Sequence, residues 1–154
     1  MKKVYLCGPI TGREAETAWR IAASHALHRA GLMVLDPMRD KEPGLLGNEG
    51  LSYDGAGGKA LVAYAERDRV DVQACDAVLA HIDTLPTTRP MWGTPWELGW
   101  ADAWGKLIVV CTPFCSVVEH LFTQAFADAI VADLGDAVEI LIDNLAEPAV
   151  EPVE

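Results

Sequence analysis

The stretch TPWELGWADAWGKLIVVCT, residues 94–112, contains the pattern that decides the fold. Its first part, TPWELGWADAWG, is predicted as a helix. Its last part, KLIVVCT, is predicted as a strand because it is a short, near-continuous apolar run. Strands of that kind are buried on both faces, which is typical of parallel sheets that helices cover on both sides. The stretch therefore predicts one helix and one strand of a layered α/β domain.

The same alternation continues on both sides of this stretch. Further strands are predicted at KVYLCGP (3–9), LMVLDP (32–37), AVLAHID (77–83) and IVAD (130–133). Helices are predicted at REAETAWRIAASHALHRAG (13–31), AYAERDRVDVQACD (63–76), SVVEHLFTQAFADA (116–129) and LGDAVEILIDNLA (134–146). The fold class predicted is therefore α/β, with a doubly wound parallel sheet of about five strands in a single domain, residues 1–146. Residues 147–154 are predicted as an acidic tail.

The segment between the second strand and the second helix is unusually long. Residues 40–59, DKEPGLLGNEGLSYDGAGGK, are rich in glycine and are predicted as a loop. Long loops in compact domains are often functional, so this one is either a surface loop or a substrate lid.

The composition excludes several classes of protein. A hydrophobic content of 51% is typical of a globular protein, and a net charge of −11 argues against nonspecific binding to nucleic acid. No apolar run is long enough to span a membrane, and MKKVYLCGPITG does not resemble a signal peptide, so a cytoplasmic protein is expected. The cysteines lack CxxC spacing and are expected to be reduced and mostly buried, and no residues have the spacing of a metal site.

Glu97 is a single carboxylate in an otherwise apolar stretch, and two interpretations remain open. Thr94, Pro95 and Glu97 match a capping box, in which the carboxylate bonds the Thr94 backbone N–H. The first turn of a helix also favours an ionised carboxylate. Since this turn follows the third predicted strand, Glu97 would face the crevice at the strand ends, where ligands bind in such sheets. An ionised carboxylate there is a candidate nucleophile for a sugar carbon, as in retaining glycosidases.

The three tryptophans around Glu97 have two interpretations as well. Trp92, Trp96 and Trp100 could form a flat apolar wall for a ligand. For Trp100 and Trp104, which are four residues apart, packing in the core or between subunits is the better interpretation. An apolar, tryptophan-rich site region also predicts a homo-oligomer.

Other polar groups follow the predicted strands. Tyr5 is placed at the end of the first strand, where its hydroxyl either bonds a carboxylate or packs in the core. The loop GPITGR, residues 8–13, either holds sugar hydroxyls or a phosphate through its N–H groups, or is a simple capped turn. Asp68, Asp71 and Asp76 are assigned to one helical stretch, from which an acid near the crevice could move protons on a leaving base.

Three blocks together resemble the nucleoside 2-deoxyribosyltransferase family. These blocks are VYLCGPITG, ERDRVDVQACDAVLAHID and GTPWELGWADAWGKLIVV, and the similarity covers residues 3–112. The resemblance implies a flavodoxin-like, oligomeric enzyme with no metal or cofactor. It implies cleavage of the N-glycosidic bond of 2′-deoxynucleosides through a covalent sugar on Glu97. It assigns Tyr5 as the hydrogen-bonding partner of Glu97, and Asp68 as the acid that interacts with the base.

The resemblance also implies a set of substrate-binding residues. They are Gly8, Pro9, Thr11, Arg13, Met91, Gly93, Thr94 and, from a neighbouring subunit, His120. Met91 departs from the family pattern. The well-known transferases have a second acid six residues before the nucleophile, and a related branch that hydrolyses deoxynucleoside 5′-monophosphates has a serine there for the phosphate.

The sequence therefore favours a nucleoside 2-deoxyribosyltransferase, whose partners are a nucleoside or nucleotide substrate and a free nucleobase. One alternative is an N-glycosidase of (deoxy)nucleoside 5′-monophosphates with water as the acceptor. Another is a nucleotide-binding or sensing module without turnover, which Met91 keeps open.

Overall fold

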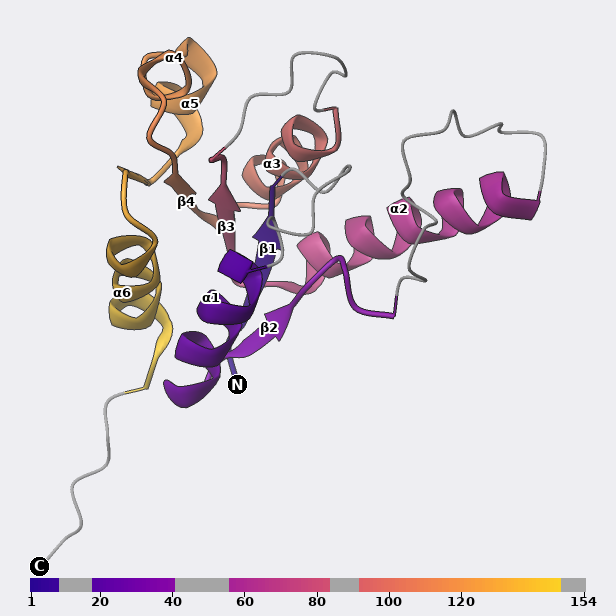
Figure 1. Cartoon of the computed structure of the whole chain (residues 1–154), viewed down its shortest axis with the longest axis horizontal. Coiled ribbons are helices and arrows are strands. Elements are labelled where there is room, and N and C mark those ends of the chain that lie inside the picture. Colours follow the sequence, from indigo (N-terminus) through magenta and orange to yellow (C-terminus); the bar gives the residue numbers. More distant parts are fainter. Residues whose placement is uncertain (9–17, 41–55, 84–91, 148–154) are drawn as a thin grey trace, which may run out of the picture.

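The computed structural model describes residues 1–8, 18–40, 56–83 and 92–147 (Figure 1). In these ranges the strands are β1 (Lys3–Cys7), β2 (Met33–Leu35), β3 (Ala77–His81), β4 (Leu107–Cys111) and β5 (Ala129–Val131). The helices are α1 (Ala18–Arg29), α2 (Ala56–Ala74), α3 (Gly93–Ala103), α4 (Cys115–Val118), α5 (Leu121–Phe126) and α6 (Leu134–Leu145).

The strands form one sheet in which every neighbouring pair is parallel, in the order β2-β1-β3-β4-β5. This is the order of a flavodoxin-like doubly wound sheet, so the predicted fold class is confirmed. The order reverses between β1 and β3, because β2 lies on one side of β1 and all later strands lie on the other. The carboxyl ends of β1 and β3 therefore flank the place where such folds bind ligands.

Helices cover both faces of the sheet (Figure 1). α1 and α6 contact each other over one face, and α2 and α3 contact each other over the other. The alternation of side chains along β1 follows these two layers. Val4 and Leu6 belong to the apolar cluster with α1 and α6, whereas Tyr5 and Cys7 belong to the cluster beneath α2 and α3. A polar side chain at position 5 or 7 can therefore reach only α2 or α3.

The ends of two helices follow local rules. Gly31, which was predicted to stop α1, has a φ of +77°, a conformation that favours glycine. α6 begins at an N-cap, Asp133, whose carboxylate accepts hydrogen bonds from the backbone N–H groups of Gly135 and Asp136 at 2.7 and 3.3 Å.

Two predicted elements differ from the structure. The helix predicted at 116–129 is divided into α4 and α5, because His120 is extended (φ −65°, ψ 130°). The side-chain amide of Gln124 donates to the Val118 carbonyl, which the break would otherwise leave without a partner at the end of α4. The loop predicted at 40–59 ends earlier than expected, since α2 begins at Ala56. Extending an existing helix costs less than starting one, so α2 continues into glycine-rich sequence. Residues 41–55 lie outside the described part of the chain.

Asp76 was expected on the same helix as Asp68 and Asp71, but it does not lie on α2. It follows the helix and accepts a hydrogen bond from the Lys3 backbone N–H at 2.8 Å and one from Lys2 Nζ at 2.9 Å. Burial opposes ionisation, but these hydrogen bonds and the charge of Lys2 lower the pKa of Asp76. Asp76 therefore holds the amino ends of β1 and β3 together, at the edge of the sheet opposite to the expected site.

The four cysteines are free, and Cys7, Cys75 and Cys111 are buried, as predicted. Within the described ranges, no helix is long and apolar enough to cross a membrane.

Candidate active site

Glu97 lies in the second turn of α3 and is 7% exposed. The helix begins at Gly93, its N-cap is Trp92, and no side chain caps it. The predicted capping box, with Thr94 as the N-cap and Pro95 at the first helical position, is therefore wrong. The physical reason is that the Glu97 carboxylate has other hydrogen-bond donors, which come from β1.

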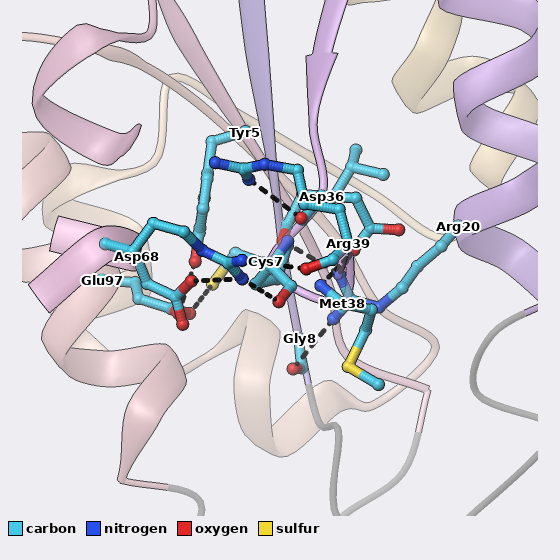
Figure 2. A network of polar contacts seen from close by, with 12 residues as sticks. Tyr5, Cys7, Gly8, Arg20, Asp36, Met38, Arg39, Asp68 and Glu97 are labelled. Atoms are coloured by element: carbon cyan, nitrogen blue, oxygen red, sulfur yellow. Dashed lines mark hydrogen bonds and ion pairs between the residues drawn. The ribbon is translucent and has the colours of Figure 1, made fainter. Parts of the chain in front are cut away.

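Two side chains of β1 hold the carboxylate, one on each oxygen (Figure 2). The Tyr5 hydroxyl donates to Oε1 of Glu97 at 2.7 Å, and the Cys7 thiol donates to Oε2 at 3.0 Å. Tyr5 was predicted at the end of the first strand, but it is the third of the five residues of β1. Both donors are fully buried, and they reach the same helix because residues two apart in a strand share a face.

Burial dominates the electrostatics of this cluster. Desolvation raises the pKa of Glu97 above its ordinary value. The hydrogen bonds from Cys7 and Tyr5 oppose this rise, as does the charge of Arg20, whereas the negative charge of Asp68 adds to it. The expectation that the helix dipole favours the ionised form is wrong, because Glu97 lies beyond the first turn and is buried.

Burial also keeps both donors protonated. Desolvation, followed by the charge of Glu97, raises the pKa of the Tyr5 hydroxyl and that of the Cys7 thiol well above their ordinary values. The cluster therefore consists of one acid and two neutral donors.

Asp68 approaches this cluster from α2 and lies beside Glu97 (Figure 2). It is buried, and its Oδ1 is 3.5 Å from a guanidinium nitrogen of Arg67. The second acid of α2, Asp71, is also buried and forms an ion pair with Arg39 at 2.6 Å. Each acid is thus paired with an arginine, Asp68 with Arg67 and Asp71 with Arg39, and Asp68 is the one that also lies beside Glu97.

Arg67 connects the same turn to α2. Its two terminal nitrogens donate to the carbonyls of Pro37 at 2.7 Å and Arg39 at 2.9 Å. The turn after β2 is therefore fastened to α2 at the residue next to Asp68.

Arg20 of α1 connects the carboxyl ends of β1 and β2. Its side chain is 2% exposed and donates to the carbonyls of Leu6 at 3.0 Å and Gly8 at 3.2 Å, and it pairs with Asp36 at 3.3 Å (Figure 2). A Cβ at Gly8 would lie 2.4 Å from the His81 carbonyl oxygen, so only glycine fits where β1 and β3 end side by side.

The remaining predicted site residues are divided between described and undescribed parts of the chain. Pro9, Thr11, Arg13 and Met91 lie outside the described residues. Gly93 is the exposed first residue of α3, whereas the side chain of Thr94 is buried and its carbonyl lies 3.9 Å from the Cys7 sulfur. His120 is exposed at the start of α5, with its ring stacked on Phe122.

The tryptophans of α3 and its flanks fall into two groups. Trp92 and Trp96 are 68% and 62% exposed, so they are available as an apolar surface. Trp100 and Trp104 are partly buried and pack against the cluster beneath α2 and α3, which confirms the packing interpretation for them.

The contacts of Cys7 and Arg20 were not predicted from the sequence. Cys7 was interpreted as a buried thiol with no role, although its position two residues after Tyr5 places both on one face of the strand. For Arg20, an arginine within a helix otherwise rich in alanine gives no signal, because exposed arginines are common in such helices. Among the described residues, no group of three or more His, Cys, Asp or Glu side chains could hold a metal ion.

Comparisons with known proteins show the family and the fold of this chain. A family model described as nucleoside 2-deoxyribosyltransferase matches residues 4–124. A solved 2-deoxyribosyltransferase from Leishmania mexicana is 19% identical, with a TM-score of 0.68 over 94% of this chain and 99% of that one. One from Bacillus psychrosaccharolyticus is 20% identical, with a TM-score of 0.64 over 88% of this chain and 90% of that one.

A third similar solved structure is an N-glycosidase. A CMP N-glycosidase from Clostridium botulinum is 18% identical, with a TM-score of 0.54 over 91% of this chain and 98% of that one. No curated protein sequence matches the chain. At these identities the solved structures establish a common fold, and the family match covers most of the sequence.

Proposed function

Because the chain belongs to the nucleoside 2-deoxyribosyltransferase family, we propose that it cleaves the N-glycosidic bond of 2′-deoxynucleosides and transfers the sugar to another base. The observation that carries this proposal is the buried Glu97 carboxylate, which Tyr5 and Cys7 hold by one oxygen each at the carboxyl edge of the sheet. Surface carboxylates need no such arrangement, whereas a nucleophile needs a fixed orientation and little competing water.

In the first half-reaction, a Glu97 oxygen attacks the anomeric carbon of the sugar. The bond from carbon to the Glu97 oxygen forms, the bond from carbon to the base nitrogen breaks, and its electron pair leaves with the base. Asp68, which lies beside Glu97, supplies a proton or hydrogen bond to the leaving base. A 2-deoxy sugar lacks the electron-withdrawing 2-hydroxyl, so its cationic transition state is easier to reach and one carboxylate can trap it.

In the second half-reaction, a nitrogen of another base attacks the same carbon and Glu97 leaves as a carboxylate. Two displacements at one carbon restore its configuration, as in retaining glycosidases. The side chains of this chain supply the nucleophile and the acid, so the proposed reaction uses no metal or cofactor. Eight residues are proposed to bind the substrate: Gly8, Pro9, Thr11, Arg13, Met91, Gly93, Thr94 and, from a neighbouring subunit, His120.

A second candidate is an N-glycosidase of deoxynucleoside 5′-monophosphates. Met91 stands where the well-known transferases have a second acid and where the hydrolase branch has a serine, so it matches neither pattern. Arg13 of the GPITGR loop is the proposed phosphate ligand, and water would be the acceptor. A preference for 5′-monophosphates that is lost on Arg13→Ala would support this candidate.

Chromatography of a substrate panel tests the proposal. Deoxynucleosides and their 5′-monophosphates are incubated with and without a second free base. A new nucleoside that forms only with the second base supports the transferase. Free base and sugar phosphate, from monophosphates alone, would support the hydrolase instead. Release from none of them would leave a binding module and would refute both.

The matched variants are Glu97→Ala and Glu139→Gln. The first should abolish turnover and the formation of a sugar adduct on the protein, detected by mass spectrometry. The second removes an exposed carboxylate of α6 and should leave turnover unchanged. An active Glu97→Ala protein would refute the assignment of the nucleophile.

A further inference from the structure

Cys7 is the donor to Glu97 that the proposed reaction has not yet used. Its sulfur lies 3.0 Å from Oε2 of Glu97 and 3.9 Å from the Thr94 carbonyl oxygen. A thiol has one proton, and the shorter contact is the one to the carboxylate. Since burial and the charge of Glu97 keep this thiol protonated, it donates a hydrogen bond to Oε2.

The two donors are chemically unequal. A phenol is a much stronger hydrogen-bond donor than a thiol, and the phenol holds the other oxygen, Oε1, at 2.7 Å. Oε2 therefore keeps more of the negative charge of the carboxylate, although its position is still restrained.

We propose that Cys7 is a positioning residue that presents Oε2 of Glu97 as the oxygen that attacks the sugar. Tyr5 then holds Oε1, which becomes the carbonyl oxygen of the sugar ester. This inference rests on the proposed function. It agrees with the hydrogen-bonding capacity of an ester, because the carbonyl oxygen remains a good acceptor after the bond forms, whereas the oxygen bonded to the sugar becomes a poor one. The stronger donor is thus placed where its bond survives, and the weaker one where its bond is lost.

Other charged and hydrogen-bonding groups also act on Glu97 and must remain constant in a test. They are Asp68 of α2 and Arg20 of α1, together with Tyr5 of β1. Substitutions of Cys7 leave all three in place, so a changed titration of Glu97 would come from the thiol itself.

The test compares Cys7→Ala and Cys7→Ser with the wild-type protein. Removing a donor to the ionised form raises the pKa of Glu97. The acid limb of kcat/KM in Cys7→Ala should therefore move up by about one pH unit, a loss of about tenfold below the limb. Its kcat should fall more than its KM changes. Cys7→Ser should restore the acid limb. Its plateau kcat should stay below that of the wild type, because a hydroxyl draws more charge from the attacking oxygen than a thiol.

Cys75→Ala is the matched control. Cys75 is another buried thiol of the same apolar cluster, and it donates to the Val72 carbonyl at 3.1 Å. Its removal should leave the acid limb unchanged. Thermal melts establish whether each variant folds. If Cys7→Ala does not fold, the plateau kcat of Cys7→Ser decides whether the proposal holds. An unmoved acid limb in Cys7→Ala, or a plateau kcat in Cys7→Ser equal to that of the wild type, would overturn the proposal.

A second measurement separates this inference from the proposed function. The titration of the Glu97 carboxyl is followed by carbon-13 NMR in the wild type and both variants, without substrate. If the titration of Glu97 shifts in the variants but the wild type turns over no substrate, the contact between Cys7 and Glu97 is established. The proposed function is then refuted, and so is the assignment of Oε2 as the attacking oxygen. Turnover with an unshifted titration would refute the role of Cys7 alone.

Discussion

At the scale of single residues, burial of the Glu97 carboxylate is unfavourable for the folded state. Desolvation outweighs its two hydrogen bonds, so its pKa is raised above 4.5 in the folded protein. Above that raised pKa, the folded state must hold a buried charge that the unfolded chain exposes to water. Groups that are unfavourable for folding but chemically useful are typical of functional sites.

Glu97→Gln should therefore be more stable than the wild type at pH 8, as measured by denaturant unfolding. Between the ordinary pKa of 4.5 and the raised folded pKa, the folded wild type binds more protons than the unfolded chain. Its stability consequently falls as pH rises through this window. The advantage of Glu97→Gln should vanish below pH 4.5, where Glu97 is neutral in both states. Equal stabilities at pH 8 would contradict the buried charge, and Glu139→Gln should show no such pH dependence.

Tyr5→Phe should reduce kcat by about 10–100-fold with little change in KM, because the hydroxyl acts on Glu97 and a hydrogen bond to a charged group contributes about 1.5–3 kcal/mol. Steady-state kinetics measure both parameters. Glu139→Gln, which removes an exposed carboxylate of α6, is the control and should leave both parameters unchanged. Unchanged kinetics in Tyr5→Phe would make Tyr5 a packing residue.

At the scale of elements, the site depends on how closely β1 and β3 approach each other. Their register pairs Cys7 with Ala80, so Gly8, the residue after β1, lies beside His81, the last residue of β3. Arg20 binds the carbonyl of Gly8 from the other side. This backbone geometry sets the direction in which Tyr5 and Cys7 face α3.

Gly8→Ala should destabilise the protein and reduce its activity together. The added Cβ would lie 2.4 Å from a backbone oxygen, which cannot move without displacing the end of β3. Gly99→Ala is the matched control, because nothing lies within 4 Å of its Cβ and Gly99 is in the middle of α3. It should gain about 0.5–1 kcal/mol from helix propensity. Thermal melts and base release measure both effects, and a stable, active Gly8→Ala would contradict the contact.

At the scale of the whole molecule, the apolar side chains left on the surface predict self-association. Trp92 and Trp96 at the start of α3 are largely exposed, as are Leu121 and Phe122 of α5. Monomeric proteins rarely expose large contiguous apolar patches, and a second copy is the usual partner in symmetric oligomers.

Light scattering at micromolar concentration should therefore find a species heavier than one chain. Phe122→Asp places a charge on α5 and should shift the protein towards the monomer. Ile21→Asp, at an exposed apolar residue of α1, should not. A wild-type monomer would contradict the prediction, and dissociation by Ile21→Asp alone would place the interface on α1 instead.

The sequence by itself determined how strands and helices alternate along the chain and that the sheet is parallel, because periodicity and continuous apolar runs are local signals. It also placed Glu97, Tyr5 and Asp68 near one edge of the sheet. Only the tertiary structure decided what Glu97 bonds. Local rules favoured the backbone of Thr94, whereas donors more than 80 residues away in sequence hold the carboxylate. The separation of Asp76 from α2 was likewise decided by a long-range contact, the hydrogen bond from the Lys3 backbone N–H. The division of α4 from α5 follows from the extended backbone at His120. The physical reason is that a capping motif competes with every donor that folding brings within reach, and the sequence does not reveal those distances.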